Sequence, residues 1–129
     1  MPKNIYLVED EAIDIKIVEN LIFQREVGIS LESFNSCQEA WDHLKIQPLA
    51  RFPDLILLDL YLPFMNGFEF LEQYHQHFFP KVEKTSIIIL TSSFQQRDME
   101  TSFSFPAVAD YLVKPFNKSH LARVLQIVG

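Results

Sequence analysis

The sequence predicts an α/β fold in which helices cover both faces of a parallel β-sheet, and three observations support it. Short apolar runs recur along the chain without the in-out alternation of a half-exposed strand, as is typical of buried parallel strands. Segments with apolar residues at helical spacing separate these runs. Prolines fall between the segments, at Pro48, Pro53, Pro63, Pro80, Pro106 and Pro115. Five repeated strand-helix units favour right-handed crossovers and a three-layer, doubly wound sandwich.

The strand candidates are rich in β-branched residues or leucine. In chain order they are Ile5–Val8, Leu31–Phe34, Leu55–Leu58, Ile87–Leu90 and Tyr111–Val113, of which 31–34 is the least apolar. Asp54 and Asp110 lie at or before the start of a strand. We therefore interpret both as structural, because ligands of such sheets bind at the opposite edge.

The first helix candidate follows the first strand and reaches about Gln24. Its residues Ile13, Ile17 and Leu21 recur at helical spacing. Ile13, Ile15 and Ile17 also alternate as in a strand, but the segment is too long for a typical strand. We therefore predict a helix.

Capping residues mark the later helices. Ser36 followed by Glu39 forms a capping-box pattern, and Ser93 with Gln96 repeats it. Asn66 before Gly67 opens a third helix with apolar positions at Phe68, Leu71 and Tyr74. A last helix carries Leu121, Val124, Leu125 and Val128 on one face.

Length, charge and cysteine content exclude several classes of protein. The 129 residues fit one domain, which we place at 1–129 with no effector domain. The net charge of -6 and the lack of a Lys/Arg cluster argue against direct nucleic-acid binding. The single Cys37 cannot form an intrachain disulfide and fits a reducing compartment, so we expect the cytoplasm. The first apolar run is too short for a signal peptide or a membrane span.

Polar residues follow the strands at the edge where ligands of parallel sheets bind. Glu9 and Asp10 follow the first strand, Asp59 the third, Thr91 the fourth and Lys114 the fifth. Clustered carboxylates repel one another unless a cation joins them, and magnesium prefers such oxygen ligands. We expect Asp10 and Asp59 to bind Mg²⁺, with Glu9 holding a metal-bound water. Asp59 would be the nucleophile in phosphoryl transfer, and Lys114 and Thr91 would stabilise the phosphoryl charge.

Four motifs in this order resemble the signatures of the response-regulator receiver family of two-component signalling, including its stand-alone chemotaxis regulators. They are Val8-Glu9-Asp10-Glu11, Leu57-Leu58-Asp59-Leu60-Tyr61-Leu62-Pro63, Leu90-Thr91-Ser92 and Tyr111-Leu112-Val113-Lys114-Pro115-Phe116. The resemblance covers the whole chain. It implies a flavodoxin-like sheet in the order 2-1-3-4-5 and a cis peptide bond between Lys114 and Pro115.

The resemblance also implies roles for individual residues. Asp59 is the expected phosphoacceptor, and the metal ligands fall on Glu9, Asp10, Asp59 and the backbone carbonyl of Tyr61. Thr91 and Lys114 would complete the catalytic set, with Thr91 and Tyr111 as switch residues. A sensor histidine kinase or phosphotransfer protein would phosphorylate Asp59. The face around the fourth helix, fifth strand and fifth helix would then bind a downstream protein that the sequence does not identify.

The chain also departs from the common family pattern. Asn66 replaces a frequent aspartate, and residues 106–109 lack the usual glycine and alanine pattern. Tyr61 and Ser93 stand where similar proteins tune access of the hydrolytic water, so the sequence leaves the lifetime of the phosphorylated state open.

Other functions stay open. A pseudo-receiver would bind partners without phosphorylation, although the intact site residues argue against it. An aspartyl-phosphate phosphatase would need a second acid where Tyr61 stands, so we do not expect an enzyme acting on other substrates. A nucleotide or flavin module would need a glycine-rich loop, and the chain has three glycines.

Several side chains have a simpler structural interpretation. The histidines His43, His75, His77 and His120 are expected at the surface. Phe94, Phe103 and Phe105 flank the fourth helix, and we favour core packing for them over a docking surface.

Overall fold

The alternating segments form the predicted strands and helices in the predicted order. The computed structural model describes residues 3–25 and 28–129. The strands are β1 (Lys3–Val8), β2 (Ile29–Phe34), β3 (Leu55–Leu58), β4 (Ser86–Thr91) and β5 (Val108–Val113). The helices are α1 (Ala12–Arg25), α2 (Cys37–Lys45), α3 (Gly67–His77), α4 (Gln96–Phe103) and α5 (Lys118–Val128), with a short 3-10 helix η1 (Leu49–Arg51).

The strands form one parallel sheet in the order β2-β1-β3-β4-β5, which confirms the predicted fold. Val8 at the end of β1 pairs with Phe34 on one side and with Leu58 on the other. Leu58 in turn pairs with Ile89, and Thr91 pairs with Val113. This register brings the carboxyl ends of β1, β3, β4 and β5 to one edge of the sheet.

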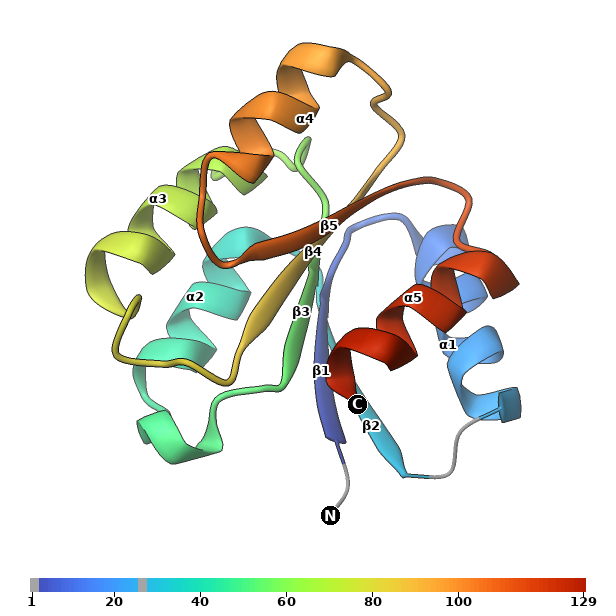
Figure 1. Cartoon of the computed structure of the whole chain (residues 1–129), viewed down its shortest axis with the longest axis horizontal. Coiled ribbons are helices and arrows are strands. Elements are labelled where there is room, and N and C mark those ends of the chain that lie inside the picture. Colours follow the sequence, from blue (N-terminus) through green and yellow to red (C-terminus); the bar gives the residue numbers. More distant parts are fainter. Residues whose placement is uncertain (1–2, 26–27) are drawn as a thin grey trace.

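Helices cover both faces of the sheet, as Figure 1 shows: α1 and α5 lie on one side, and α2, α3 and α4 on the other. Successive residues of β3 enter different cores. Leu55 and Leu57 pack in the core with α1 and α5, whereas Ile56 and Leu58 pack in the other. Because both faces are buried, the strand is apolar at every position.

Two of the predicted helix caps are confirmed. The Glu39 N–H donates to the Ser36 Oγ over 3.0 Å at the start of α2. At α3, the Glu69 N–H donates to Asn66 Oδ1 over 2.9 Å, and the Asn66 N–H donates back to the Glu69 carboxylate. The predicted cap at Ser93 is wrong. Helix α4 begins after Gln95, and the Ser93 hydroxyl donates instead to a carboxylate.

Some phenylalanines and histidines also differ from the prediction. Phe94 and Phe103 are exposed rather than packed in the core, and only Phe105 packs against it. His75 is half-buried between the rings of Phe79 and Phe105, whereas a surface position was expected. A helical period alone does not show which of several aromatic residues face the sheet.

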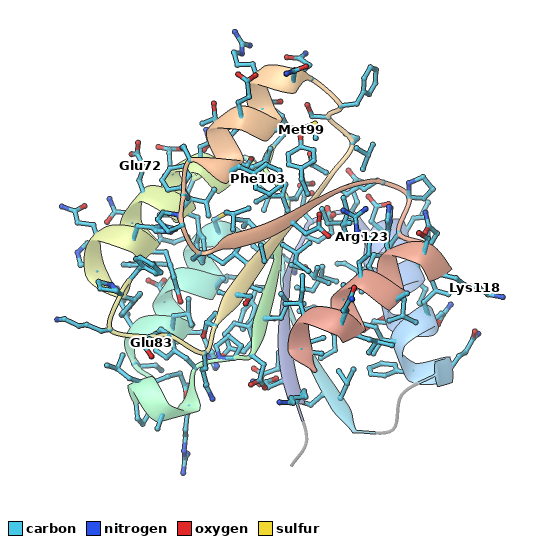
Figure 2. The ribbon with its side chains drawn as sticks, in the orientation of Figure 1. Glu72, Glu83, Met99, Phe103, Lys118 and Arg123 are labelled. Atoms are coloured by element: carbon cyan, nitrogen blue, oxygen red, sulfur yellow. The ribbon has the colours of Figure 1, made fainter. Side chains whose placement is uncertain are left out.

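The two acids interpreted as structural make contacts within the scaffold. Asp54 accepts a hydrogen bond from the Asn4 N–H over 2.8 Å, which joins the start of β3 to β1. Asp110 pairs with the Arg123 guanidinium of α5, which Figure 2 labels. Across the described ranges, no helix combines the length and apolarity needed to cross a membrane.

Candidate functional site

The backbone of the sheet fixes the residues at its carboxyl edge. The Asp59 N–H donates to the Val8 carbonyl over 3.2 Å, and the Lys114 N–H donates to the Thr91 carbonyl over 2.8 Å. Both bonds extend a strand ladder by one residue. Asp59 and Lys114 therefore leave the sheet with defined directions, and their side chains meet above the strand ends.

Lys114 lies at the centre of this site. Its Nζ is 2.9 Å from Asp59 Oδ2, 2.5 Å from Glu9 Oε1 and 3.0 Å from Asp14 Oδ2. The peptide bond between Lys114 and Pro115 is cis, as the resemblance implied. The structure therefore brings Glu9, Asp59 and Lys114 together as predicted and adds Asp14, which the sequence analysis did not single out.

Asp14 could have been found from its position in the chain. It lies four residues after Asp10, in the first turn of α1. Asp10 itself precedes α1, but an acid in the first turn of the helix that follows β1 lies close to the carboxyl edge of the sheet, as Glu9 and Asp10 do.

Burial and charge oppose each other in this cluster. Burial raises the pKa of Glu9 to about 7, and the ammonium of Lys114 acts to lower it. Burial alone would lower the pKa of Lys114, but the carboxylates of Glu9, Asp59 and Asp14 raise it above its ordinary value. Lys114 is therefore a cation at neutral pH, and it offsets the negative charge beside Asp59.

The donor atoms at this edge suit a hard cation. Glu9 is 1% exposed, and its Oε1 accepts no well-aligned hydrogen bond in the described part of the chain despite its ion pair with Lys114. Asp10 is exposed next to it, and the Tyr61 N–H lies 3.3 Å from Asp59 Oδ1. Carboxylate oxygens of Glu9, Asp10 and Asp59 are therefore gathered at the edge of the sheet where Mg²⁺ was predicted.

Side chains alone would not complete a metal shell. Within residues 3–25 and 28–129, no three His, Cys, Asp or Glu side chains are arranged to hold a metal ion. Magnesium ordinarily keeps several waters and uses few protein carboxylates, so this donor set fits it when waters or phosphate oxygens complete the shell.

Gly67 allows the start of α3 to pack directly against the backbone that follows β3. Its N–H donates to the Leu60 carbonyl over 2.8 Å. A Cβ at this position would lie 2.6 Å from the Asp59 carbonyl oxygen and 2.7 Å from Leu60 Cα. Glycine is required here because the helix start approaches the backbone of Asp59 directly.

The two predicted switch residues are joined through the loop after β4. Thr91 is buried, and its Oγ1 lies 3.4 Å from the Ser93 N–H. Tyr111 is also buried, and its hydroxyl donates to the Ser93 carbonyl over 2.9 Å. Residues 91–93 therefore connect the edge near Asp59 to β5.

A second carboxylate, Asp98 of α4, also escaped the sequence analysis. It is 4% exposed, and its Oδ2 accepts hydrogen bonds from the hydroxyls of Tyr61 and Ser93, each over 2.6 Å. The sequence gives little signal for this role, because an acid in the first turn of a helix ordinarily complements the helix dipole.

Comparisons with known proteins agree with this geometry. Residues 5–126 match the family described as "Response regulator receiver domain". The response regulator ArlR of Staphylococcus aureus is 34% identical over 127 residues, which cover 96% of this chain and 52% of ArlR. The chain thus spans about half the length of the curated relatives it matches.

Two solved structures at 30% identity have the same fold. The phosphorylated cyanobacterial phytochrome response regulator RcpA aligns with a TM-score of 0.78 over 99% of this chain and 89% of its own. The Mn²⁺-bound form of response regulator Rcp1 aligns with a TM-score of 0.78 over 97% of this chain and 90% of its own. The match over most of the chain, at the fold and at the sequence level, places this protein in the response-regulator receiver family of two-component signalling proteins.

Proposed function

We propose that this chain is a magnesium-dependent phosphorylation switch that accepts a phosphoryl group on Asp59. The observation that carries the proposal is the position of the Asp59 carboxylate, 2.9 Å from the Lys114 ammonium at the edge of the sheet where Glu9, Asp10 and Thr91 also lie. Glu9 and Asp14 also contact Lys114, so the ammonium lies where it can offset the charge of a phosphoryl group on Asp59.

The residues of the site would divide the work of phosphoryl transfer. An Asp59 carboxylate oxygen attacks phosphorus in a phosphohistidine of the donor, so that a P–O bond forms as the P–N bond breaks. The donor imidazole leaves with the bonding electron pair and takes a proton from solvent. Lys114 and Thr91 then bind phosphoryl oxygens, which offsets the charge on the acyl phosphate.

Magnesium would be held by Asp10, Asp59 and the backbone carbonyl of Tyr61, with Glu9 on a metal-bound water. When bound, the ion would neutralise charge on the phosphoryl group. The Mn²⁺-bound relative Rcp1 supports a divalent cation in this family. The buried Oε1 of Glu9 supports the same place in this chain.

The output surface would lie around α4, β5 and α5. Phe94, Met99 and Phe103 are exposed there, and Figure 2 labels the last two on α4. A hollow of about 560 Å³ is lined by Gln96, Met99, Glu100, Phe103 and Ser104. Exposed aromatic and methionine side chains are common in protein-binding surfaces, so we propose that a downstream protein binds here after Thr91 and Tyr111 rearrange.

The physiological donor would be a sensor histidine kinase or a phosphotransfer protein, and residues 1–129 would act as one receiver unit in the cytoplasm. The chain would catalyse only the phosphorylation and dephosphorylation of its own Asp59, and it would not act on other substrates. A phosphorylation-independent pseudo-receiver is disfavoured, because Glu9, Asp59 and Lys114 form the charge cluster that phosphoryl transfer needs.

The test is labelling by a small phosphodonor such as acetyl phosphate. With magnesium, the protein should gain the mass of one phosphoryl group, and EDTA should prevent the gain. Asp59→Ala should also prevent it, whereas Asp54→Ala, which changes a scaffold carboxylate, should still be labelled. Labelling that survives Asp59→Ala, or no labelling of the native protein by any small donor, would contradict the proposal.

A further inference from the structure

A single carboxylate of α4 holds the loops that follow β3 and β4. Asp98 Oδ2 accepts one hydrogen bond from the Tyr61 hydroxyl and one from the Ser93 hydroxyl. Tyr61 comes two residues after Asp59, and Ser93 comes two residues after Thr91. Both loops at the reactive edge are therefore joined to the same oxygen atom.

The exposure of the two partners shows that this contact is specific. Tyr61 is 56% exposed, yet its hydroxyl reaches a carboxylate that is only 4% exposed. The Tyr61 ring is also edge-on to Phe68, and the hydrogen bond to Asp98 then fixes where its hydroxyl lies. Hydrogen bonds between hydroxyls and an ionised carboxylate are among the short and strong ones.

The contact also shifts the pKa of both groups. The hydroxyls of Ser93 and Tyr61 hold the pKa of Asp98 below its ordinary value. In return, the Asp98 carboxylate raises the pKa of the Tyr61 phenol. Asp98 is therefore ionised at neutral pH, and Tyr61 stays protonated as its donor.

The network extends to β5. The Ser93 carbonyl accepts a hydrogen bond from the Tyr111 hydroxyl over 2.9 Å, so Ser93 is joined to α4 through its side chain and to β5 through its backbone. The Ser102 hydroxyl also donates to the Asp98 carbonyl over 2.7 Å, one turn further along α4. The first turn of α4 is thus tied to both loops of the reactive edge.

We propose that Asp98 is a positioning residue that holds this resting arrangement and opposes the rearrangement of Thr91 and Tyr111 on phosphorylation. The inference rests on the proposed function, because the groups joined to Asp98 are those that must move relative to Asp59. A contact made only in the resting state lowers the population of the rearranged state. Loss of Asp98 therefore favours the state that accepts and retains the phosphoryl group.

The first experiment tests the contact without phosphorylation. Tyrosines labelled with ¹³C at Cζ are titrated by NMR in the native protein and in Asp98→Asn and Asp98→Ala, with Tyr61→Phe used to assign the Tyr61 signal. The pKa of Tyr61 should fall in Asp98→Ala and less in Asp98→Asn, whose amide oxygen still accepts. An unchanged Tyr61 titration in Asp98→Ala would overturn the proposed contact.

The second experiment tests its consequence. The initial rate of labelling by acetyl phosphate with magnesium should rise about tenfold in Asp98→Ala, a factor that corresponds to about 1.4 kcal/mol. Tyr61→Phe and Ser93→Ala remove one donor each and should give smaller increases, which keeps the test valid if Asp98→Ala folds poorly. Asp42→Ala removes an exposed, hydrogen-bonded aspartate of α2 and should label at the native rate.

The two experiments separate the possible failures. If no variant and no native protein is labelled, the proposed function fails while the Tyr61 titration still reports on the contact. If the native protein is labelled and the Tyr61 titration changes, but the labelling rates of Asp98→Ala, Tyr61→Phe and Ser93→Ala equal the native rate, the positioning role of Asp98 is wrong.

Discussion

Replacement of Lys114 by methionine should make folding depend on a divalent cation. Methionine keeps the length of the side chain and removes its charge. The Glu9 and Asp59 carboxylates, both buried, would then face each other without the ammonium that contacts each of them within 3 Å. Because burial already raises the pKa of Glu9 to about 7 and the ammonium acts to lower it, the unfolding is measured in alkaline buffer, where both groups are ionised. Their repulsion then acts on the folded state alone, because the unfolded chain separates them.

The magnitude follows from the burial of the pair. Removal of one partner from a buried ion pair costs about 3–5 kcal/mol. Asp14 and Lys114 are only partly buried, so water can reach the cluster, and we expect the lower end, about 3 kcal/mol. Magnesium at about 100 times its Kd would return about 2.7 kcal/mol. The variant should gain more from magnesium than the native protein, because its carboxylates no longer share their charge with the ammonium.

The assay is urea unfolding followed by circular dichroism, with EDTA or with magnesium. The control is Lys118→Met, which removes an exposed lysine from the first turn of α5. In EDTA, Lys114→Met should unfold at clearly lower urea than the control, and magnesium should close most of the gap. Equal midpoints for the two variants in EDTA would refute the claim that Lys114 offsets this cluster of carboxylates.

Three further predictions concern the scaffold. The Nε2 of His75 accepts a hydrogen bond from the Ala107 N–H, and burial lowers the pKa of His75, so the imidazole is neutral in the folded state. The unfolded chain therefore binds more protons than the folded one. The stability that the neutral imidazole contributes is present above a pH of about 6.5 and is lost as the pH falls below it. His75→Gln should make the free energy of unfolding, measured by urea denaturation, less dependent on pH in this acid range. Gly67→Ala should destabilise by about 1–3 kcal/mol through its clash with the Asp59 backbone, whereas Gly28→Ala, with nothing within 4 Å, should change little by the same urea assay. Phe64 has φ 68 and is 100% exposed, so Phe64→Gly should raise the free energy of unfolding by up to about 1 kcal/mol, and a lower urea midpoint would count against backbone strain there.

Most of the fold followed from the sequence because local pattern and burial agree in this chain. The run Leu55–Leu58 is apolar at every position and lies at the centre of the sheet, so its unbroken apolarity directly indicates burial on both faces. The order of the strands came from the family resemblance, since periodicity does not say which strands pair. The extent of β5 was underestimated: the structure begins it at Val108, before the exposed Ala109 and half-buried Asp110.

Some residues of the site were likewise predicted from the sequence, and others were missed. Asp59 and Lys114 were predicted because they follow strands, and parallel strands end at the same edge. Asp14 was missed although its position in the first turn after β1 gives a signal. Asp98 was missed because its role depends on how α4 is placed over that edge, and the sequence does not encode this placement as a local pattern. The exposure of Phe94 was missed for the same reason, since hydrophobicity alone favours the core.

The central claim is that Asp59 itself receives the phosphoryl group. Its most direct test is to label the native protein with acetyl phosphate and magnesium, reduce the acyl phosphate with borohydride, and sequence the peptides by mass spectrometry. Reduction converts a phosphorylated aspartate to homoserine, so homoserine should appear at position 59 and only after labelling. Homoserine at Asp10, Asp14 or another acid in place of position 59 would contradict the account.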